Sequence, residues 1–208
     1  MENSIQNFTF QNPTKILFGK NRIEDIDNEI PKDAKVLVLY GGGSVKNNGA
    51  FNRAVKALGD REWDEFSGIE ANPTFETLMK AVEKVRAGKF NYLLAIGGGS
   101  VIDGTKFVSA ASLFTEDPVD LFGWGVGKGL PVQEVVPFGT ILTLPATGSE
   151  MNSGAVITLV EKKAKVSFRG AKTFPVFSVL EPELTYTLPV RQLVNGLLDT
   201  FIHVMENY

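Results

Sequence analysis

The chain has 208 residues, of which 43% are hydrophobic and 22% charged, and its formal net charge is −3. This composition is typical of a folded protein with enough apolar material for a core, and the slight acidity argues against nucleic-acid and anionic-membrane partners. The absence of cysteine excludes disulfides and thiolate metal sites. A polar N-terminus without a signal-peptide pattern, and no apolar run of about 18 residues, predict a soluble cytoplasmic protein without a membrane span.

Two short apolar runs, each followed by a glycine loop, predict strands that are buried on both faces. Lys35 to Tyr40 runs into Gly41-Gly42-Gly43-Ser44, and Tyr92 to Ile96 runs into Gly97-Gly98-Gly99-Ser100. Helices are predicted from about Asn48 to Leu58, between Asn72-Pro73-Thr74 and Gly88, and from Ser100 to about Leu113. This alternation predicts an α/β, Rossmann-like parallel sheet with helices on both faces. Both glycine loops should then lie beyond the carboxyl ends of the strands, where such sheets bind ligands.

The second half of the chain predicts a strand over Gly139 to Leu144, a hairpin over Gly154 to Val160 and Lys163 to Phe168, and a strand over Pro175 to Leu180. A final helix should open at Pro189 and run to the last residue. Its apolar positions are so broadly spread that they predict burial on more than one side. Because this helix has no stop signal, we expect the chain to be cut there, with apolar residues left exposed.

The loop Gly97-Gly98-Gly99-Ser100 predicts a phosphate site. Glycines after a buried strand let the backbone approach a pyrophosphate, and the start of the next helix presents free amides to an anion. Ser100 is expected to cap this helix, with Asp103 in a capping-box-like position. The alternative interpretation is a plain strand-to-helix turn with a good cap.

The first glycine loop bears on the choice between NADP and NAD. No acidic residue stands at the end of its strand to receive a ribose hydroxyl, whereas Ser44 and Lys46 lie close by in the sequence. Small residues with a hydroxyl and a lysine suit a 2′-phosphate, so the loop favours NADP. A generic turn is the alternative.

Hydroxyls and cations follow the later strands. Thr143 and the run Thr147-Gly148-Ser149-Glu150 could bond phosphate or ribose, although such residues are also ordinary in loops. The basic residues of the hairpin fit a solvated face, from which a single lysine could still reach a cofactor; they are Lys162, Lys163, Lys165, Arg169 and Lys172.

Asp199 and His203, the single histidine of the chain, are four residues apart in the final helix and should share one face. A carboxylate and an imidazole so placed can bind one divalent metal, but two ligands do not complete a site. On these residues alone, a structural hydrogen bond is the ordinary interpretation.

Together these motifs resemble the iron-containing (group III) alcohol dehydrogenases, in particular their NADPH-dependent butanol dehydrogenase and aldehyde reductase branch. The stretches that carry the resemblance are Pro13 to Lys20, Tyr40 to Lys46, Asn72-Pro73, Gly97 to Lys106, Leu142 to Glu150 and Thr185 to Pro189. Members of this family are nearly twice as long as this chain. The resemblance therefore implies an N-terminal portion: a dinucleotide-binding domain over residues 1–188, like that of dehydroquinate synthase, and the first helix of a truncated all-helical metal-binding domain over residues 189–208.

The resemblance also assigns roles to residues. It implies that Gly41, Gly42 and Ser44 surround the adenosine ribose and its 2′-phosphate, and that Asn72 lies along the cofactor cleft. Gly97, Gly98, Gly99 and Ser100 would hold the pyrophosphate, with Asp103 supporting that turn. Thr143, Thr147 and Ser149 would contact phosphate and ribose, Lys165 the nicotinamide ribose, and Asp199 and His203 would be metal ligands. This last role reverses the structural interpretation of that pair.

The function implied for the intact protein is an NADP(H)- and metal-dependent oxidoreductase that interconverts primary alcohols and aldehydes, with Fe²⁺ (or Zn²⁺) as a Lewis acid. The resemblance implies a homodimer and a small-molecule substrate. Two alternatives remain open. One is a lyase like dehydroquinate synthase, which uses NAD and zinc, and the acid-free first loop counts against it. The other is a nucleotide-binding fragment that turns nothing over.

Overall fold

The computed structural model describes residues 7, 9–123 and 125–206, and its centre is a six-stranded parallel sheet. The strand order is β1-β8-β5-β4-β2-β3. The strands are β1 (Lys15–Phe18), β2 (Val36–Tyr40), β3 (Trp63–Phe66), β4 (Tyr92–Gly98), β5 (Phe138–Leu144) and β8 (Phe177–Leu180). The predicted α/β parallel sheet is thereby confirmed.

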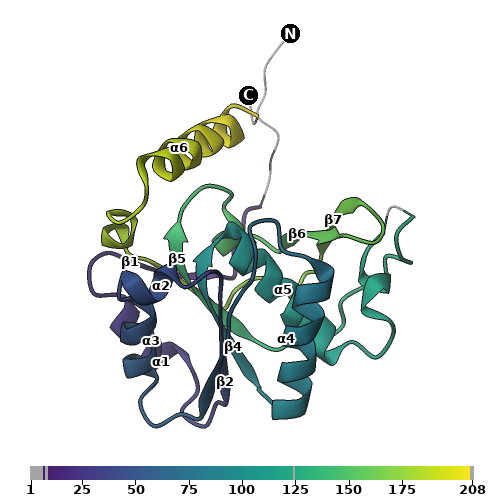
Figure 1. The fold of residues 1–208 in the computed structure, drawn as a ribbon, viewed down its shortest axis with the longest axis horizontal. Coiled ribbons are helices and arrows are strands. Elements are labelled where there is room, and N and C mark those ends of the chain that lie inside the picture. The colour runs from purple at the N-terminus through teal and green to yellow at the C-terminus, as the bar shows by residue number, and fades with distance from the viewer. Residues whose placement is uncertain (1–6, 8, 124, 207–208) are drawn as a thin grey trace.

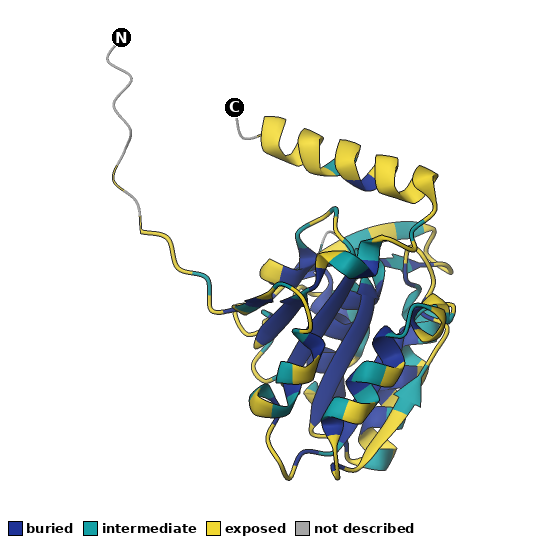
Figure 2. Ribbon diagram, turned by 90° about the vertical axis from the view of Figure 1, so that its left-hand side faces the viewer, coloured by how far each residue is buried: buried dark blue, intermediate teal, exposed yellow. Residues whose placement is uncertain are grey.

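Helices cover both faces of this sheet (Figure 1). One face carries α1 (Ile26–Glu29), α2 (Ser44–Asn47) and α3 (Ala50–Leu58), and the other carries α4 (Phe75–Gly88) and α5 (Gly99–Leu113). Successive residues of β2 serve the two sides: Val36 and Val38 belong to the core under α3, and Leu37 and Leu39 to the core under α4 and α5. The central strands β2, β4, β5 and β8 are buried along nearly all of their length (Figure 2), which explains the continuous apolar runs of β2 and β4.

The two edge strands were not predicted, because neither has a long apolar run: β1 has three consecutive apolar residues, and β3 has two acidic residues between Trp63 and Phe66. In β3, Trp63, Asp64 and Glu65 are polar or amphipathic, and Trp63 and Asp64 are exposed. In β1 only Leu17 is buried. Edge strands are commonly short and polar, so neither carries the pattern of a central strand.

The predicted hairpin is confirmed as the antiparallel pair β6 (Gly154–Leu159) and β7 (Ala164–Arg169). It packs beside α5, where Ala155, Ile157 and Phe168 join the core. A bridge from Thr158 to Thr74, with the amide of Thr158 bonding the Pro73 carbonyl at 2.9 Å, ties the hairpin to the start of α4. The hairpin therefore closes one side of the sheet's carboxyl end.

The final helix, α6 (Val190–Met205), is not buried on more than one side, contrary to the prediction from its broad apolar pattern, but the expectation that its apolar residues are left exposed is confirmed. Gly196 is its buried residue among those described, and nearly the whole helix is exposed (Figure 2). It approaches the loop after β5 at Gly196, close to the Pro145 carbonyl, and at Thr200, whose hydroxyl lies 3.4 Å from the Ala146 carbonyl. Residues 207–208, to which the prediction also extended this helix, lie outside the described part.

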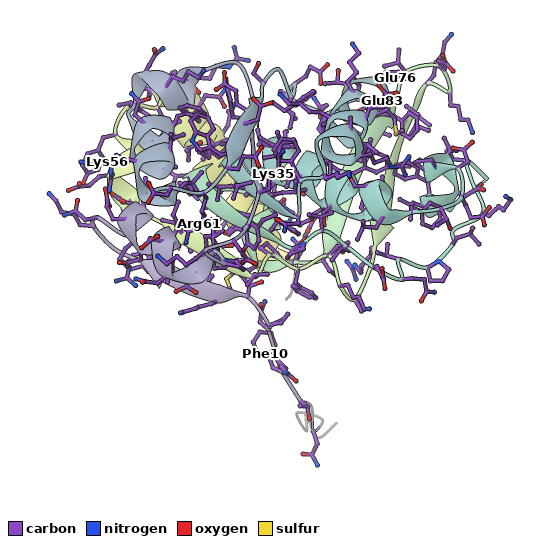
Figure 3. The ribbon with its side chains drawn as sticks, turned by 90° about the horizontal axis from the view of Figure 1, so that it is seen from below. Phe10, Lys35, Lys56, Arg61, Glu76 and Glu83 are labelled. Carbon is purple, nitrogen blue, oxygen red and sulfur yellow. The ribbon has the colours of Figure 1, made fainter. Side chains whose placement is uncertain are left out.

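Arg61 lies in the α1–α3 layer, on the side of the molecule seen in Figure 3. The buried guanidinium of Arg61 bonds the carbonyls of Pro31, Leu58 and Ile30 and the side chain of Asp27, which closes the α1–α3 layer. Phe10 lies on the segment that projects away from the sheet. No helix in the described ranges is long and apolar enough to cross a membrane.

Candidate functional site

A cleft of about 640 Å³ opens at the carboxyl end of the sheet, between the start of α5, the loop after β5, and the β6–β7 hairpin. It gathers eight of the residues predicted for cofactor or metal: Asn72, Gly99, Ser100, Asp103, Thr147, Ser149, Lys165 and His203. These residues come from five segments that are far apart in the sequence. Their convergence supports the ligand site expected at this edge of the sheet.

The glycines of the second loop are needed for packing. A Cβ atom on Gly97 would lie 2.6 Å from a methyl group of Val101, and one on Gly99 would lie 2.5 Å from the Thr147 hydroxyl. The N-cap of α5 is Gly98, which has no side chain to bond the first amides of the helix. The loop thus combines close packing with backbone donors at a helix start, the arrangement that binds anions elsewhere.

The predicted capping box at this helix is wrong. The Ser100 hydroxyl accepts a bond from the amide of Asn72 at 3.4 Å, and Asp103 accepts one from the amide of Val156 at 3.0 Å. Because α5 already begins at Gly99, Ser100 lies inside the helix and cannot act as its cap. Both side chains instead connect the helix to neighbouring walls of the cleft.

The loop after β5 presents two hydroxyls beside Gly99. The Thr147 and Ser149 hydroxyls lie 2.7 Å apart, and Gly148 between them adopts a left-handed conformation with φ of 66°. Asn152 donates from its side-chain amide to the Gly148 carbonyl at 2.9 Å and so holds the loop. Thr143, further back on β5, is buried and does not line the cleft.

Lys165 and Asn72 meet across the cleft. The Lys165 ammonium donates to the Asn72 side-chain carbonyl at 2.8 Å, and Asn72 has a positive φ of 61°, which is uncommon for a non-glycine residue. This cation of the hairpin is therefore directed into the cleft, whereas Lys162 bonds the Val126 carbonyl on the outside.

A buried charge pair lies beneath the cleft. Lys106 is fully buried, and its ammonium donates to the Asn152 side chain at 2.8 Å and the Gly154 carbonyl at 2.7 Å, with Asp103 at 3.6 Å. Burial lowers the pKa of Lys106 to about 8, although the Asp103 charge opposes this shift. Burial likewise raises the pKa of Asp103, against the attraction of Lys106.

The first glycine loop lies outside this cleft. Gly41, Gly42 and Ser44 follow β2, which pairs with β4, so the two loops are neighbours at the same edge. No heavy atom lies within 4 Å of a Cβ built on Gly42, which leaves room over the loop. Lys46, predicted to favour a phosphate, is 2.9 Å from Glu65 and lies over the ring of Phe51. Glu65 was not predicted as a site residue, because its strand β3 has no apolar pattern.

Asp199 and His203 share one face of α6, as predicted, with the Asp199 carboxylate 3.8 Å from the His203 Nε2 atom. This separation exceeds a hydrogen bond but is that of an ion pair when His203 is protonated. Glu206 lies 3.4 Å from His203 Nδ1. Within the described residues, no group of three or more His, Cys, Asp or Glu side chains could hold a metal.

Several residues of the cleft were not predicted, namely Pro73, Asn152, Gly154, Ala155, Val156, Ser167, Phe168 and Arg169. Arg169 had been assigned with the other basic residues to a solvated face. Most of these residues belong to the hairpin, whose contribution depends on where it packs rather than on its own pattern.

The comparisons with known proteins agree with this geometry. The family model described as iron-containing alcohol dehydrogenase matches residues 13–182. The NADPH-dependent aldehyde reductase YqhD of Escherichia coli is 49% identical over 206 residues, covering 98% of this chain and 52% of YqhD. The probable NADH-dependent butanol dehydrogenase 2 of Bacillus subtilis is 42% identical over 207 residues, covering 98% of this chain and 52% of its own length.

Solved structures give the same result. The crystal structure of E. coli YqhD matches with a TM-score of 0.92 over 97% of this chain and 52% of that chain. NADH-dependent butanol dehydrogenase A of Thermotoga maritima matches with a TM-score of 0.90 and 39% identity, over 97% of this chain and 50% of that chain. The chain thus spans about half the length of the curated relatives it matches.

Proposed function

Because the chain belongs to the iron-containing alcohol dehydrogenase family, we propose that its cleft is the NADP(H) site of a metal-dependent oxidoreductase acting on primary alcohols and their aldehydes. The observation that carries this proposal is the convergence of the α5 start, the Thr147 and Ser149 hydroxyls, and the Asn72–Lys165 pair around one cleft. The similarity to YqhD and the butanol dehydrogenases supports it.

Each wall of the cleft has a part in cofactor binding. The backbone amides of Gly97, Gly98, Gly99 and Ser100 bind the pyrophosphate at the positive end of α5. Thr147 and Ser149 donate to phosphate or ribose, Asp103 holds the facing hairpin through Val156, and Lys165 reaches the nicotinamide ribose. Thr143 supports the loop from β5. The result is a nicotinamide held in one orientation, which is the protein's main contribution to hydride transfer.

We assign the coenzyme as NADP(H), with Gly41, Gly42 and Ser44 around the 2′-phosphate. The loop has no acid at the end of β2, and Lys46 is the nearest cation in the sequence. The named preferences of the relatives differ, since YqhD is named for NADPH and the Bacillus proteins for NADH. The acid-free loop therefore carries this assignment.

We further propose that Asp199 and His203 supply two ligands to Fe²⁺ or Zn²⁺. A carboxylate and an imidazole suit either ion, and their 3.8 Å separation on α6 fits this role. A bound metal would polarise the substrate oxygen as a Lewis acid, and NADPH would supply the hydride. The residues of this chain contribute the two metal ligands and the placement of the nicotinamide.

The proposed domain boundary is at residue 188. Residues 1–188 form the cofactor domain, and residues 189–208 belong to a helical metal-binding domain, since α6 stands apart from the sheet (Figure 1). For the intact protein we propose a cytoplasmic homodimer acting on small molecules. For the 208-residue chain by itself we propose cofactor binding without turnover, because two ligands do not complete a catalytic metal site.

Calorimetric titration with NADPH and NADH tests the proposal. The wild-type chain should bind one NADPH more tightly than NADH, and the double variant Thr147→Val with Ser149→Ala should weaken NADPH binding about tenfold. Ser112→Ala is the matched control, because this buried hydroxyl of α5 has no hydrogen-bond partner and lies away from the cleft. No NADPH binding, or equal loss in the control, contradicts the proposal.

An assay with NADPH, butanal and Fe²⁺ or Zn²⁺ tests the metal assignment. The chain alone should show no turnover, but Asp199→Ala and His203→Ala should each weaken the binding of Zn²⁺ measured without cofactor. Turnover by the chain alone would overturn the proposal of an inactive fragment, and unchanged Zn²⁺ binding would overturn the ligand assignment.

A further inference from the structure

The fully buried Lys106 carries a charge that has no role in the proposed function so far. It lies in the second turn of α5, beneath the cleft, and does not itself line the cleft. Burying a charged ammonium carries a large desolvation penalty unless it is paired and hydrogen-bonded. Its three partners, Asp103, Asn152 and Gly154, all line the cleft.

The contacts of Lys106 fix the orientation of the Asn152 side chain. The ammonium can only donate, so the Asn152 carbonyl oxygen must face it, and this oxygen also accepts the amide of Gly154 at 3.0 Å. The amide nitrogen of Asn152 is then directed to the Gly148 carbonyl at 2.9 Å. A continuous set of hydrogen bonds thus runs from Lys106 to the loop that carries Thr147 and Ser149.

The Lys106–Asp103 pair also holds the β6–β7 hairpin, which forms the opposite wall of the cleft. Asp103 accepts the amide of Val156 from β6, and its second carboxylate oxygen is buried without a hydrogen-bond partner, with the Lys106 ammonium at 3.6 Å. Helix α5, the loop after β5 and the hairpin are therefore joined through one buried charge pair. Removing either partner would leave an uncompensated buried charge.

We propose that Lys106 is a positioning residue for the cofactor phosphates: it aligns the Thr147–Ser149 loop through Asn152, and its positive charge is coupled to the anion in the cleft. This inference rests on the proposed NADP(H) site. Lys106 touches neither cofactor nor substrate, so its influence on binding passes through Asn152 and Asp103 and through its electrostatic field.

Bound NADPH and the protonated form of Lys106 should stabilise each other. The charges that act on Lys106 are Asp103 of α5 and Glu150 of the loop after β5, which favour its protonated form, and Arg169 of β7, which opposes it. With its pKa near 8, Lys106 is partly neutral at pH 8 to 9. A pyrophosphate bound nearby favours the protonated lysine, so NADPH binding should take up a proton in this range and weaken as the pH rises further.

Calorimetry of NADPH binding to the full 208-residue chain at pH 8.5, in two buffers of different ionisation enthalpy, measures this proton uptake. The wild-type chain should take up a fraction of one proton per NADPH. Lys106→Met should abolish the uptake and raise the NADPH Kd about tenfold. Thr105→Val is the matched control, because Thr105 is equally buried on α5 but bonds only within the helix.

A second variant separates positioning from folding. Asn152→Ala keeps the lysine but removes its link to the Gly148 carbonyl, so the NADPH Kd should rise about threefold while the proton uptake remains. If Lys106→Met does not fold, the wild-type proton uptake and the Asn152→Ala result still decide the inference. Wild-type binding without proton uptake, or unchanged NADPH affinity in Asn152→Ala, would overturn it. A wild-type chain that binds no NADPH would overturn the proposed function instead.

Discussion

Lys46 follows the first glycine loop by two residues, and its ammonium is shared between the Glu65 carboxylate and the rings of Tyr40 and Phe51. These contacts place the lysine beside the proposed 2′-phosphate site, but with its charge balanced by Glu65. Glu65 thus competes with a bound phosphate for the same cation. Its carboxylate also adds a repulsive charge near that phosphate.

Glu65→Gln should therefore tighten NADPH binding about threefold and leave NADH binding within twofold of wild type. Asp64→Asn is a matched control, since it removes the same charge from the neighbouring residue of β3, where Asp64 pairs with Lys84 at 2.6 Å. Parallel calorimetric titrations of both coenzymes measure the effect. An equal change in affinity for NADPH and NADH would show that Lys46 does not interact with the 2′-phosphate.

At the level of single residues, sequence reasoning found the groups whose chemistry is local. Thr147 and Ser149 follow a predicted strand within three or five residues, and the structure places both in the cleft. Asn152 was not found, because its importance comes from a bond to Lys106, 46 residues earlier in the chain. The burial of Lys106 is equally invisible in the sequence, since lysine is ordinarily exposed.

The two glycine loops follow neighbouring strands but differ in the reason for their glycines. Gly97 is confined by Val101 of the next helix, whereas Gly42 faces open space. A methyl group on Gly97 would overpack the junction between β4 and α5. One on Gly42 would intrude only on a bound ligand.

We therefore expect Gly97→Ala to lower the free energy of unfolding by roughly 1–3 kcal/mol, and Gly42→Ala to change it by less than about 0.5 kcal/mol. In contrast, Gly42→Ala should weaken NADPH binding at least fivefold. Urea denaturation and NADPH titration of both variants provide the two measurements. Normal NADPH affinity in Gly42→Ala would place the cofactor away from this loop.

Among the strands, the buried central ones could be predicted from the sequence, whereas the exposed edge strands could not. The central strands β2, β4 and β5 were predicted within about two residues, and β2 and β4 are continuous apolar runs. The edge strands β1 and β3 were missed, because the apolar run of β1 is only three residues long and β3 has two acidic residues at its centre. For α6 the predicted exposure of apolar residues is confirmed, but the predicted burial on more than one side is wrong, since a sequence shows that a face is apolar and not what covers it.

For the whole molecule, the notable surface is the exposed apolar side of α6. Val190, Leu197 and Phe201 are 76%, 64% and 61% exposed, and apolar surface of this extent on one helix favours association. We expect the chain to self-associate at micromolar concentration. Phe201→Ser should reduce the associated fraction severalfold by light scattering, whereas the control Phe18→Ser, at an equally exposed position on β1, should not. A monomeric wild-type chain, or equal effects of the two substitutions, would contradict this expectation.

The overall arrangement of strands and helices could be predicted from the sequence, whereas much of the detail of the site could not. The alternation of strands, glycine loops and helices specified a parallel sheet with a ligand site at its carboxyl edge, and the structure confirms that sheet. The order of the strands and the docking of the β6–β7 hairpin against α5 were not predicted, because they depend on long-range packing. That packing gives the cleft its second wall.

The central claim, that NADP(H) binds between the α5 start and the loop after β5, is tested most directly by the amide NMR spectrum of the chain during titration with NADPH. The largest amide shifts are expected at Gly97–Ser100 and Thr147–Ser149, with smaller shifts at Gly42 and Ser44. A second cleft lies at the C-terminal end of α5 and is lined by Leu113, Phe114 and Glu134. The amide signals of these residues should stay unchanged. Shifts concentrated at that second cleft, or no shifts at saturating NADPH, would contradict the account.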